Sequence, residues 1–483
     1  MKKECGILMP VFSLPGEYGI GTFGKESYDF LDFLKKSGHT VWQTLPLGQT
    51  TYGDSPYQTT GDVSFNPYFI DLEDLHSRGL ITDKELSAER LKVDKIDYAR
   101  LYKRRYALYK KAYERFIATD EFLSFVNGGK VASFALFTAV KAVYGELGNF
   151  SEELKTRNKR AINEFLNEHY DDYLFYSFIQ FILFDEYDKL KAYAKKLGIK
   201  IMGDLPLYVA ADGAEVWEYP SQFSLDENLT PQKVAGVPPD YFSADGQLWG
   251  NPVYDYARMR RDGYRWWKNR LKFALNRYDL VRIDHFRGLD RFWAIPYGEK
   301  ATAGEWEKAD GREFLTKFSP KRLIAEDLGT IDDGVRSLLK ETKLPGMKVL
   351  LFAFDKNPNN PYLPENVDYN SVCYVGTHDN DTAYGYIKSL NKADFLYLRR
   401  EVAKRLNEKA TCFKSAKSLA FGLTDLLYTV NSKLVISSFA DLCGLDNAYR
   451  INEPSTMGNW RVRFKKELFT DELAARLLTL SKR

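Results

Sequence analysis

Short apolar runs alternate along much of the chain with segments in which apolar residues recur every three or four positions. The clearest helical segment runs from Leu183 to Leu197, where the apolar residues step by four, three, four and three positions and Gly198 follows directly. This spacing places the apolar residues on one helix face, and glycine is common just past a helix end. The same reasoning predicts a helix whose apolar face lies between Phe23 and Leu34.

The short apolar runs predict buried parallel strands, because a strand covered on both faces shows no polar alternation. Residues 6–21, rich in glycine and proline, are instead predicted to form an ordered loop. Helical patterns between most runs indicate an α/β fold, and a total of eight strands favours a (β/α)8 TIM barrel, although a doubly wound sheet would share much of the pattern. The predicted strands are residues 40–47, 65–72, 199–209, 280–284, 323–326, 346–354, 371–379 and 434–439.

Two long segments interrupt this alternation, and both are predicted to be insertions in a single barrel formed by residues 1–483. Residues 73–170 are charged and helical in pattern, which predicts a helical insertion subdomain. Residues 212–256 are dense in proline, glycine and aromatic residues, which predicts a long ordered loop. Ordered loops of this length are usually functional.

Composition narrows the function classes. With 69 basic and 66 acidic residues the net charge is +3, which argues against a nucleic-acid or anionic-membrane partner. The four cysteines, Cys5, Cys373, Cys412 and Cys443, are scattered, so neither a disulfide framework nor a zinc site is expected. The amino terminus lacks an apolar core of signal-peptide length, and no apolar run has membrane-spanning length. These features predict a soluble protein of the cytoplasm.

Three carboxylates fall at the ends of predicted strands: Asp284, Glu326 and Asp379. Barrel active sites are built at the carboxyl ends of the strands, so this placement favours an active site. Each residue has a simpler interpretation when taken alone, since a strand-end acid is often the N-cap of the next helix. Taken together at the ends of three strands, they favour catalysis.

The neighbours of these acids predict different roles for them. Arg282 lies two residues before Asp284, on the same strand face, and is expected to lower the pKa of Asp284 and to favour a nucleophile. Glu326 follows three apolar residues, which favours a protonated acid/base. His378 beside Asp379 is suited to form hydrogen bonds with hydroxyl groups of a substrate. Both residues could instead have purely structural roles, Arg282 in an ion pair and His378 as a hydrogen-bonded histidine of the core.

Several motifs identify a family. The chain resembles, nearly end to end, the 4-α-glucanotransferases of the amylomaltase (disproportionating enzyme) type, glycoside hydrolase family 77 in the α-amylase clan. The motifs are Ser13-Leu-Pro, Tyr18-Gly-Ile-Gly, Trp42-Gln-Thr-Leu-Pro-Leu-Gly, Ser55-Pro-Tyr-Gln, Asn66-Pro-Tyr-Phe-Ile-Asp-Leu, Gly203-Asp-Leu-Pro, Pro238-Pro-Asp-Tyr-Phe, Gly246-Gln-Leu-Trp-Gly-Asn-Pro, Arg282-Ile-Asp-His-Phe-Arg-Gly, Ile324-Ala-Glu-Asp-Leu-Gly, Thr377-His-Asp-Asn and Asn452-Glu-Pro-Ser-Thr-Met-Gly-Asn-Trp-Arg.

The resemblance implies a catalytic role for each acid: Asp284 as nucleophile, Glu326 as acid/base and Asp379 as stabiliser of the transition state. It implies no metal and no organic cofactor, and it makes the segment 236–252 the candidate cover over the substrate. The implied substrate-binding residues are Tyr57, Asp204, Asp240, Gln247, Trp249, Arg282, His285, His378 and Asn452.

The expected function is transfer of an α-1,4-glucan segment to the 4-hydroxyl of an acceptor through a covalent glucosyl-enzyme. The expected partners are maltooligosaccharides and α-1,4-glucans, with no nucleic acid and no membrane, for a monomer or weak homo-oligomer. Two alternatives stay open at this point: an α-1,4-glucan hydrolase of the same clan, and a non-catalytic glucan-binding protein. The chain departs from the family pattern at residues 59–65, which are bulkier and include an acid, and at Glu453 and Ser455.

Overall fold

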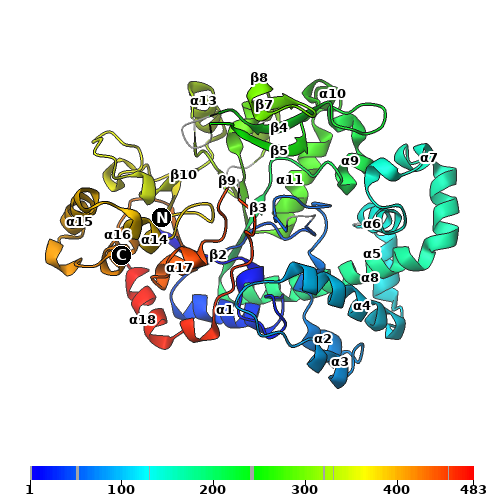
Figure 1. The fold of residues 1–483 in the computed structure, drawn as a ribbon, viewed down its shortest axis with the longest axis horizontal. Helices are drawn as coiled ribbons and strands as arrows, with labels where there is room; N and C mark the ends of the chain where they lie inside the picture. The colour runs from blue at the N-terminus through cyan, green and yellow to red at the C-terminus, as the bar shows by residue number, and fades with distance from the viewer. Residues whose placement is uncertain are drawn as a thin grey trace.

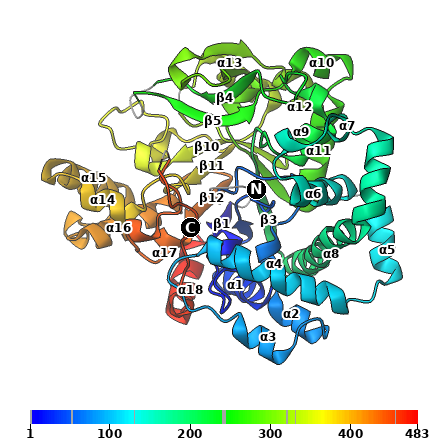
Figure 2. The same cartoon turned by 45° about the vertical axis from the view of Figure 1, so that its right-hand side comes forward.

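Eight parallel strands close into a barrel in the order β1-β12-β11-β10-β9-β6-β3-β2 (Figures 1 and 2). The computed structural model describes residues 3–50, 54–129, 131–239, 244–318, 321–329, 331–454 and 456–483. Strands that follow one another in the barrel sequence lie side by side, which confirms the (β/α)8 prediction. The barrel strands are β1 (Glu4–Leu8), β2 (Val41–Gln43), β3 (Lys200–Leu205), β6 (Leu280–Ile283), β9 (Leu323–Ala325), β10 (Gly346–Val349), β11 (Ser371–Tyr374) and β12 (Leu434–Ser438).

The strand prediction is wrong at one place and omits one strand. Residues 65–72 form no strand: Asn66 caps a short 3-10 helix over Pro67–Phe69, since proline removes a backbone donor that a central strand needs. The missing strand is β1, which overlaps the start of the segment 6–21 predicted as a loop. It pairs with both β2 and β12, and Gly6 lets it approach Val41 closely. The glycine and proline residues that follow β1 concealed it.

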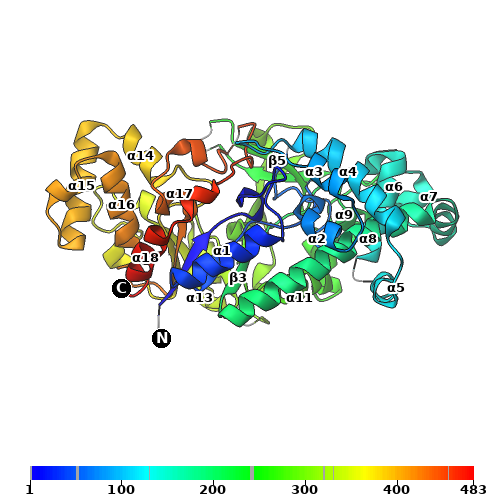
Figure 3. The same cartoon turned by 90° about the horizontal axis from the view of Figure 1, so that it is seen from below.

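Helices surround the barrel, and the two predicted from periodicity are present. The helix ending at Gly198 is much longer than its periodic part, and Gly198 has the left-handed φ of 76° that ends it. In Figure 3, α1 and α18 lie side by side along the barrel wall. The helices are α1 (Lys25–Lys36), α2 (Leu72–Ser77), α3 (Asp83–Ala88), α4 (Tyr98–Arg115), α5 (Asp120–Asn127), α6 (Ala132–Tyr144), α7 (Glu152–Lys155), α8 (Lys159–Leu197), α9 (Ala214–Glu218), α10 (Tyr256–Arg261), α11 (Arg265–Arg277), α12 (Gly311–Leu315), α13 (Asp333–Thr342), α14 (Ala383–Ser389), α15 (Lys392–Leu406), α16 (Ala416–Leu427), α17 (Phe439–Leu442) and α18 (Asp471–Leu480).

The segment 73–170, which the sequence predicts to be an insertion, contains α3 to α7, most of α2 and the start of α8, and its described residues form no strand. Figure 1 shows these helices to one side of the barrel, where α6 packs against α8 and α9. In the described part of the chain no single helix has the length and apolar composition to cross a membrane. The pair α5 and α6 meets that test only when joined across a bend of 87°.

The segment 212–256 is not one continuous loop. It contains α9 and two strands, β4 (Lys233–Val237) and β5 (Gln247–Pro252). These join β7 (Arg291–Pro296) and β8 (Glu305–Lys308) in a four-stranded antiparallel sheet of order β5-β4-β7-β8. The density of proline and glycine concealed these strands in the sequence. Strand β4 forms backbone hydrogen bonds with β5 on one side and with β7, some 60 residues away, on the other.

Candidate active site

Two of the three predicted acids leave the barrel side by side. Strands β6 and β9 are paired with Ile283 opposite Ala325, and Asp284 and Glu326 are the residues that follow. The ladder continues through them, since the Glu326 amide donates to the carbonyl of Ile283 at 3.1 Å. Asp379 lies beyond the end of β11, in the loop that precedes α14. The barrel therefore places all three acids at its carboxyl end, as the sequence analysis predicted.

A buried arginine links Asp284 to a fourth acid. Arg282 Nη1 lies 2.9 Å from Asp284 Oδ1 and 2.6 Å from Asp204 Oδ2. The prediction that Asp284 has a lowered pKa is wrong: burial raises the pKa of Asp284 to about 7, and the nearby charge of Arg282 offsets only part of this rise. Arg282 thus lowers the pKa of Asp284, as expected, but its effect is smaller than the opposite effect of burial.

Glu326 is held by two backbone amides. Its Oε2 accepts from the amide of His285 at 2.8 Å, and its Oε1 accepts from the amide of Leu328 at 2.9 Å. His285 adopts a left-handed φ of 46°, uncommon for a residue with a side chain, in the turn that brings its amide to Glu326. Burial raises the pKa of Glu326 to about 8, with Arg282 lowering it and Asp284 raising it further. This environment suits a carboxyl group that donates a proton near neutral pH.

Asp379 is more exposed than Asp284. Its side chain is 39% exposed, against 26% for Asp284, so a ligand in the barrel mouth can reach it. Asn452 Nδ2 donates to Asp379 Oδ1 at 2.6 Å, and His378 Nε2 lies 3.2 Å from Asp379 Oδ2. The side chain is therefore oriented from two sides while its carboxylate stays open to solvent.

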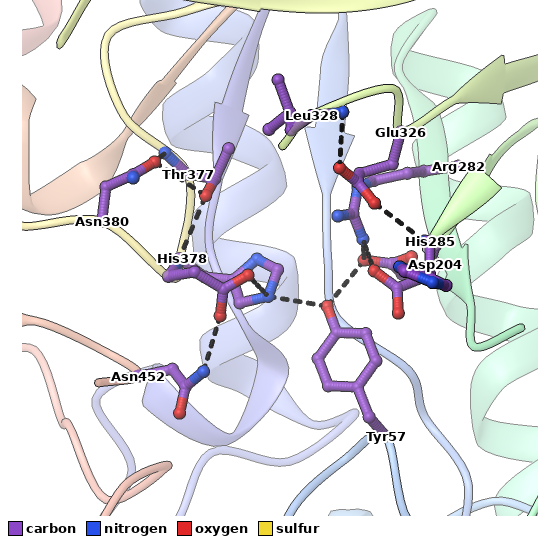
Figure 4. Close-up of polar contacts among 12 residues, drawn as sticks. Tyr57, Asp204, Arg282, His285, Glu326, Leu328, Thr377, His378, Asn380 and Asn452 are labelled. Carbon is purple, nitrogen blue, oxygen red and sulfur yellow. Dashed lines mark hydrogen bonds and ion pairs between the residues drawn. The ribbon is translucent and has the colours of Figure 1, made fainter. Parts of the chain in front are cut away.

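Tyr57 connects the two halves of the site (Figure 4). Its hydroxyl donates to Asp204 Oδ2 at 2.8 Å and lies 2.9 Å from His378 Nε2, and the Tyr57 and His378 rings are stacked. Figure 4 shows Asp204, Arg282 and Glu326 on one side and His378 and Asn452 on the other. Burial lowers the pKa of His378, so its imidazole is neutral near pH 7 and can both donate and accept hydrogen bonds.

Strand β5 reaches the site through Trp249. The Trp249 ring meets the His285 ring edge to face, with centroids 4.7 Å apart, and its Nε1 donates to Gln247 Oε1 at 3.1 Å. Gln58, next to Tyr57, donates to the Trp249 carbonyl at 3.2 Å. These contacts bring Trp249 and Gln247 to the barrel mouth. The predicted contact Asp240 lies outside the described residues.

One residue of the site escaped the sequence analysis. Arg450 donates from Nη2 to the carbonyl of Asp379 and from Nε to the carbonyl of Asn452, both at 2.8 Å. Its Nη1 also pairs with Asp381 at 2.6 Å. Arg450 thereby fixes the loop after β11 against the late loop near the C-terminus. The sequence signal that could have identified Arg450 is its position two residues before the Asn452 motif.

The described residues contain no group of three or more His, Cys, Asp or Glu side chains placed to hold a metal ion. The groups of the site that can act on a substrate are carboxyl groups and hydrogen-bonding side chains. Acidic side chains at the strand ends of an eight-stranded parallel barrel define a barrel enzyme whose chemistry rests on carboxyl groups.

Comparison with known proteins extends this assignment. The model of the 4-alpha-glucanotransferase family matches residues 9–469. The 4-alpha-glucanotransferase of Clostridium butyricum is 38% identical over 492 residues, covering 98% of this chain and 99% of that protein. The enzyme of the same name from Aquifex aeolicus is 40% identical over 483 residues, with 96% of each covered. Among solved structures, the amylomaltase from Streptococcus agalactiae in complex with acarbose aligns with a TM-score of 0.93 at 34% identity, covering 99% of this chain and 98% of that one.

This chain belongs to the 4-alpha-glucanotransferase family. The resemblance inferred from its motifs is confirmed over nearly the whole length.

Proposed function

We propose that this enzyme moves a segment of an α-1,4-glucan onto the 4-hydroxyl of an acceptor glucose or glucan by a retaining double displacement. The observation that carries the proposal is the pairing of Asp284 and Glu326 at the ends of adjacent strands in a chain of this family. The acarbose held by the Streptococcus agalactiae amylomaltase supports an oligosaccharide substrate. The expected partners are therefore maltooligosaccharides and α-1,4-glucans, and the chemistry requires no cofactor.

In the first half of the reaction, the Asp284 carboxylate attacks the anomeric carbon of the donor. The bond between that carbon and the glycosidic oxygen breaks, and the protonated Glu326 gives its proton to the departing oxygen. The product is a β-linked glucosyl ester of Asp284. The raised pKa of Glu326 favours this role, because a carboxyl group with an ordinary pKa would already be ionised at neutral pH.

In the second half, the acceptor 4-hydroxyl gives its proton to Glu326 and attacks the same carbon. The ester bond to Asp284 breaks, the α-1,4 linkage is restored, and both acids return to their starting states. Arg282 remains charged throughout and stabilises the Asp284 carboxylate as it forms again.

The remaining polar residues are proposed to hold the donor sugar at its reacting ring. Asp379 faces the barrel mouth and accepts hydrogen bonds from ring hydroxyls, while Asn452 and His378 orient it. The further proposed contacts come from the barrel end and from β5; they are Tyr57, Asp204, Asp240, Gln247, Trp249, Arg282 and His285.

Transfer in place of hydrolysis requires that water be kept from the glucosyl-enzyme. We propose that β5 covers the donor site, within the segment 236–252 expected from sequence to do so. The contact of Trp249 with His285, next to Asp284, supports this location. A covered site excludes water and leaves room for a sugar hydroxyl that binds through its own contacts.

Incubation of the purified protein with maltotriose tests the function. We expect both shorter and longer oligosaccharides, glucose among them, with total reducing ends constant, because each transfer breaks and remakes one glycosidic bond. A rise in reducing ends would establish the alternative hydrolase and contradict the cover over the site. An unchanged maltotriose solution would favour the alternative of a glucan-binding protein.

The pH dependence of kcat/KM for maltotriose is expected to be bell-shaped. Asp284 attacks only when ionised, so the rate falls as the pH decreases through about 7. Glu326 donates only when protonated, so the rate falls as the pH increases through about 8. Because the two carboxyl groups interact, the acidic and basic limbs of the pH profile report the titration of the pair and not of each residue separately. An optimum at a pH where both acids are fully protonated or both fully ionised would contradict these roles.

A cytoplasmic location and a monomeric or weakly associated state are also proposed. The support comes from composition: the four cysteines are scattered and include no Cys-x-x-Cys pair, as in proteins of a reducing compartment. Sedimentation velocity of the purified protein distinguishes a monomer from a stable oligomer.

A further inference from the structure

Trp460 belongs to the family motif that begins at Asn452, yet the proposed reaction assigns it no role. Its backbone has a left-handed φ of 66°, which glycine adopts without a steric penalty and large residues rarely take. The Trp460 amide donates to the carbonyl of Ile451 at 3.0 Å, and the Trp460 carbonyl accepts from the hydroxyl of Tyr98 at 2.9 Å. A strained residue held in this way indicates a functional role for its side chain.

The Trp460 side chain packs against two residues of the proposed donor site. It is 6% exposed, and its ring centroid lies 5.7 Å from that of Tyr57 and 6.0 Å from that of His378. The rings of Tyr57 and His378 are themselves stacked, with centroids 5.4 Å apart. These separations are typical of aromatic pairs in contact, so the three rings form one cluster in which each meets the other two.

The orientation of Tyr57 and His378 decides which hydrogen bonds they make. The Tyr57 hydroxyl reaches Asp204 Oδ2 and His378 Nε2, and the same nitrogen lies 3.2 Å from Asp379 Oδ2 (Figure 4). Hydrogen bonds weaken steeply when their angles change, so rotation of either ring would break this arrangement. Because the Trp460 ring packs against both rings, neither can turn without displacing it.

The helical insertion supports Trp460 from the opposite direction. Tyr98 is the first residue of α4 and is 5% exposed, and it holds the Trp460 carbonyl through its hydroxyl. Just before this helix, the amide of Ile96 donates to the carbonyl of Arg461 at 2.9 Å. A series of direct contacts therefore runs from α4 through Trp460 to His378.

We propose that Trp460 is a positioning residue, which holds the rings of His378 and Tyr57 in the orientation that binds the donor sugar. The helical insertion supports it through the hydroxyl of Tyr98. The inference rests on the proposed function, because that function assigns His378 and Tyr57 to the donor. Trp460 acts through these two side chains and needs no contact of its own with the glucan.

Nitrogen NMR of protein labelled in its histidines tests the positioning without any reaction. The chain has five histidines, and His378→Gln assigns the resonances of His378. The Nε2 resonance reports the hydrogen bond with Tyr57. Trp460→Leu removes the ring, and we expect it to move the His378 resonances toward those of a freely rotating imidazole. Trp460→Phe keeps an aromatic ring and should move them less.

The rate of glucose release from maltotriose measures the consequence for the reaction. We expect Trp460→Leu to lower kcat by about 10–100-fold with little change in KM, because misplaced groups at the reacting ring act on the transition state. Tyr98→Phe removes the hydrogen bond to the Trp460 carbonyl and should lower kcat severalfold. In the Trp460→Leu background Tyr98→Phe should have no further effect on kcat, since both changes act through the same ring.

The matched control is Trp217→Leu. Trp217 is fully buried in α9, where its ring contacts Phe137 and Phe150. Its replacement should lower the melting temperature while the folded protein keeps its His378 resonances and its kcat. If Trp460→Leu does not fold, Tyr98→Phe carries the test and should move the His378 resonances in the same direction by a smaller amount.

Unmoved His378 resonances in folded Trp460→Leu, or an equal loss of kcat in Trp217→Leu, would overturn the proposal. The resonances are measured without substrate, so they do not depend on transfer. If they move as expected in a protein that leaves maltotriose unchanged, the positioning role stands and the proposed transfer reaction fails.

Discussion

Replacing Asp284 with asparagine reduces the rate of glucan transfer by roughly 10⁴-fold or more, because the variant cannot form the glucosyl ester. Glu326→Gln reduces the rate of glucan transfer by roughly 10²–10⁴-fold, the range for loss of a general acid. The two variants differ with a donor such as maltosyl fluoride, whose leaving group needs no proton. Glu326→Gln releases fluoride in the first step, and Asp284→Asn does not. Initial rates with maltotriose and with the fluoride measure both effects.

The control for these variants is Asp97→Asn. Asp97 caps α4 in the helical insertion by accepting from the amide of Arg100 at 3.0 Å, and asparagine caps a helix about as well. Its activity should match that of the unmodified enzyme. Fluoride release by Asp284→Asn at the full rate would show that another group attacks the anomeric carbon.

Arg282→Met is expected to destabilise the protein and to shift its pH profile. The side chain is 3% exposed and lies between Asp204 and Asp284, so its loss leaves the buried carboxyl group of Asp204 and the partly buried one of Asp284 without their cation. Breaking a buried pair in this way costs about 3–5 kcal/mol of unfolding free energy. The pKa of Asp284 then increases further, which moves the acidic limb of the activity profile to higher pH. Urea unfolding and a kcat/KM profile measure the two effects.

Arg282→Lys separates charge from geometry. Lysine keeps the cation but loses the planar group that reaches both acids, so we expect an intermediate loss of stability and a smaller shift of the acidic limb. An Arg282→Met variant with an unchanged acidic limb would mean that the charge of Arg282 does not control ionisation of Asp284.

The barrel could be predicted from the chain because its strands are short apolar runs that end in polar residues. This rule identified β6 and β9 together with Asp284 and Glu326 at their ends. It was wrong at residues 65–72, whose apolar run contains Pro67, and it omitted β1, whose pairing partners lie far along the chain. Strand β4 was concealed for the same reason, since its pairing with β7 is not a local property, and β5 joins the sheet only through β4.

The site was predictable to a similar extent. Strand ends and the family motifs gave the acids, but the backbone amides that hold Glu326 depend on the turn at His285. Arg450 reaches Asp379 from a loop 71 residues later in the chain, a contact that no local pattern encodes. The pKa of Asp284 was assigned the wrong direction because the depth of burial, which outweighs Arg282, emerges only when the barrel closes.

Trapping the covalent intermediate tests the central claim most directly. Glu326→Gln is mixed with maltosyl fluoride, quenched in acid, digested and analysed by peptide mass spectrometry. The first step proceeds without the acid, while the second is slowed by the missing base, so the ester accumulates. The proposed mechanism predicts a maltosyl group on Asp284. Fluoride release without any labelled peptide, or a label on Asp379, would contradict the assignment of Asp284 as nucleophile.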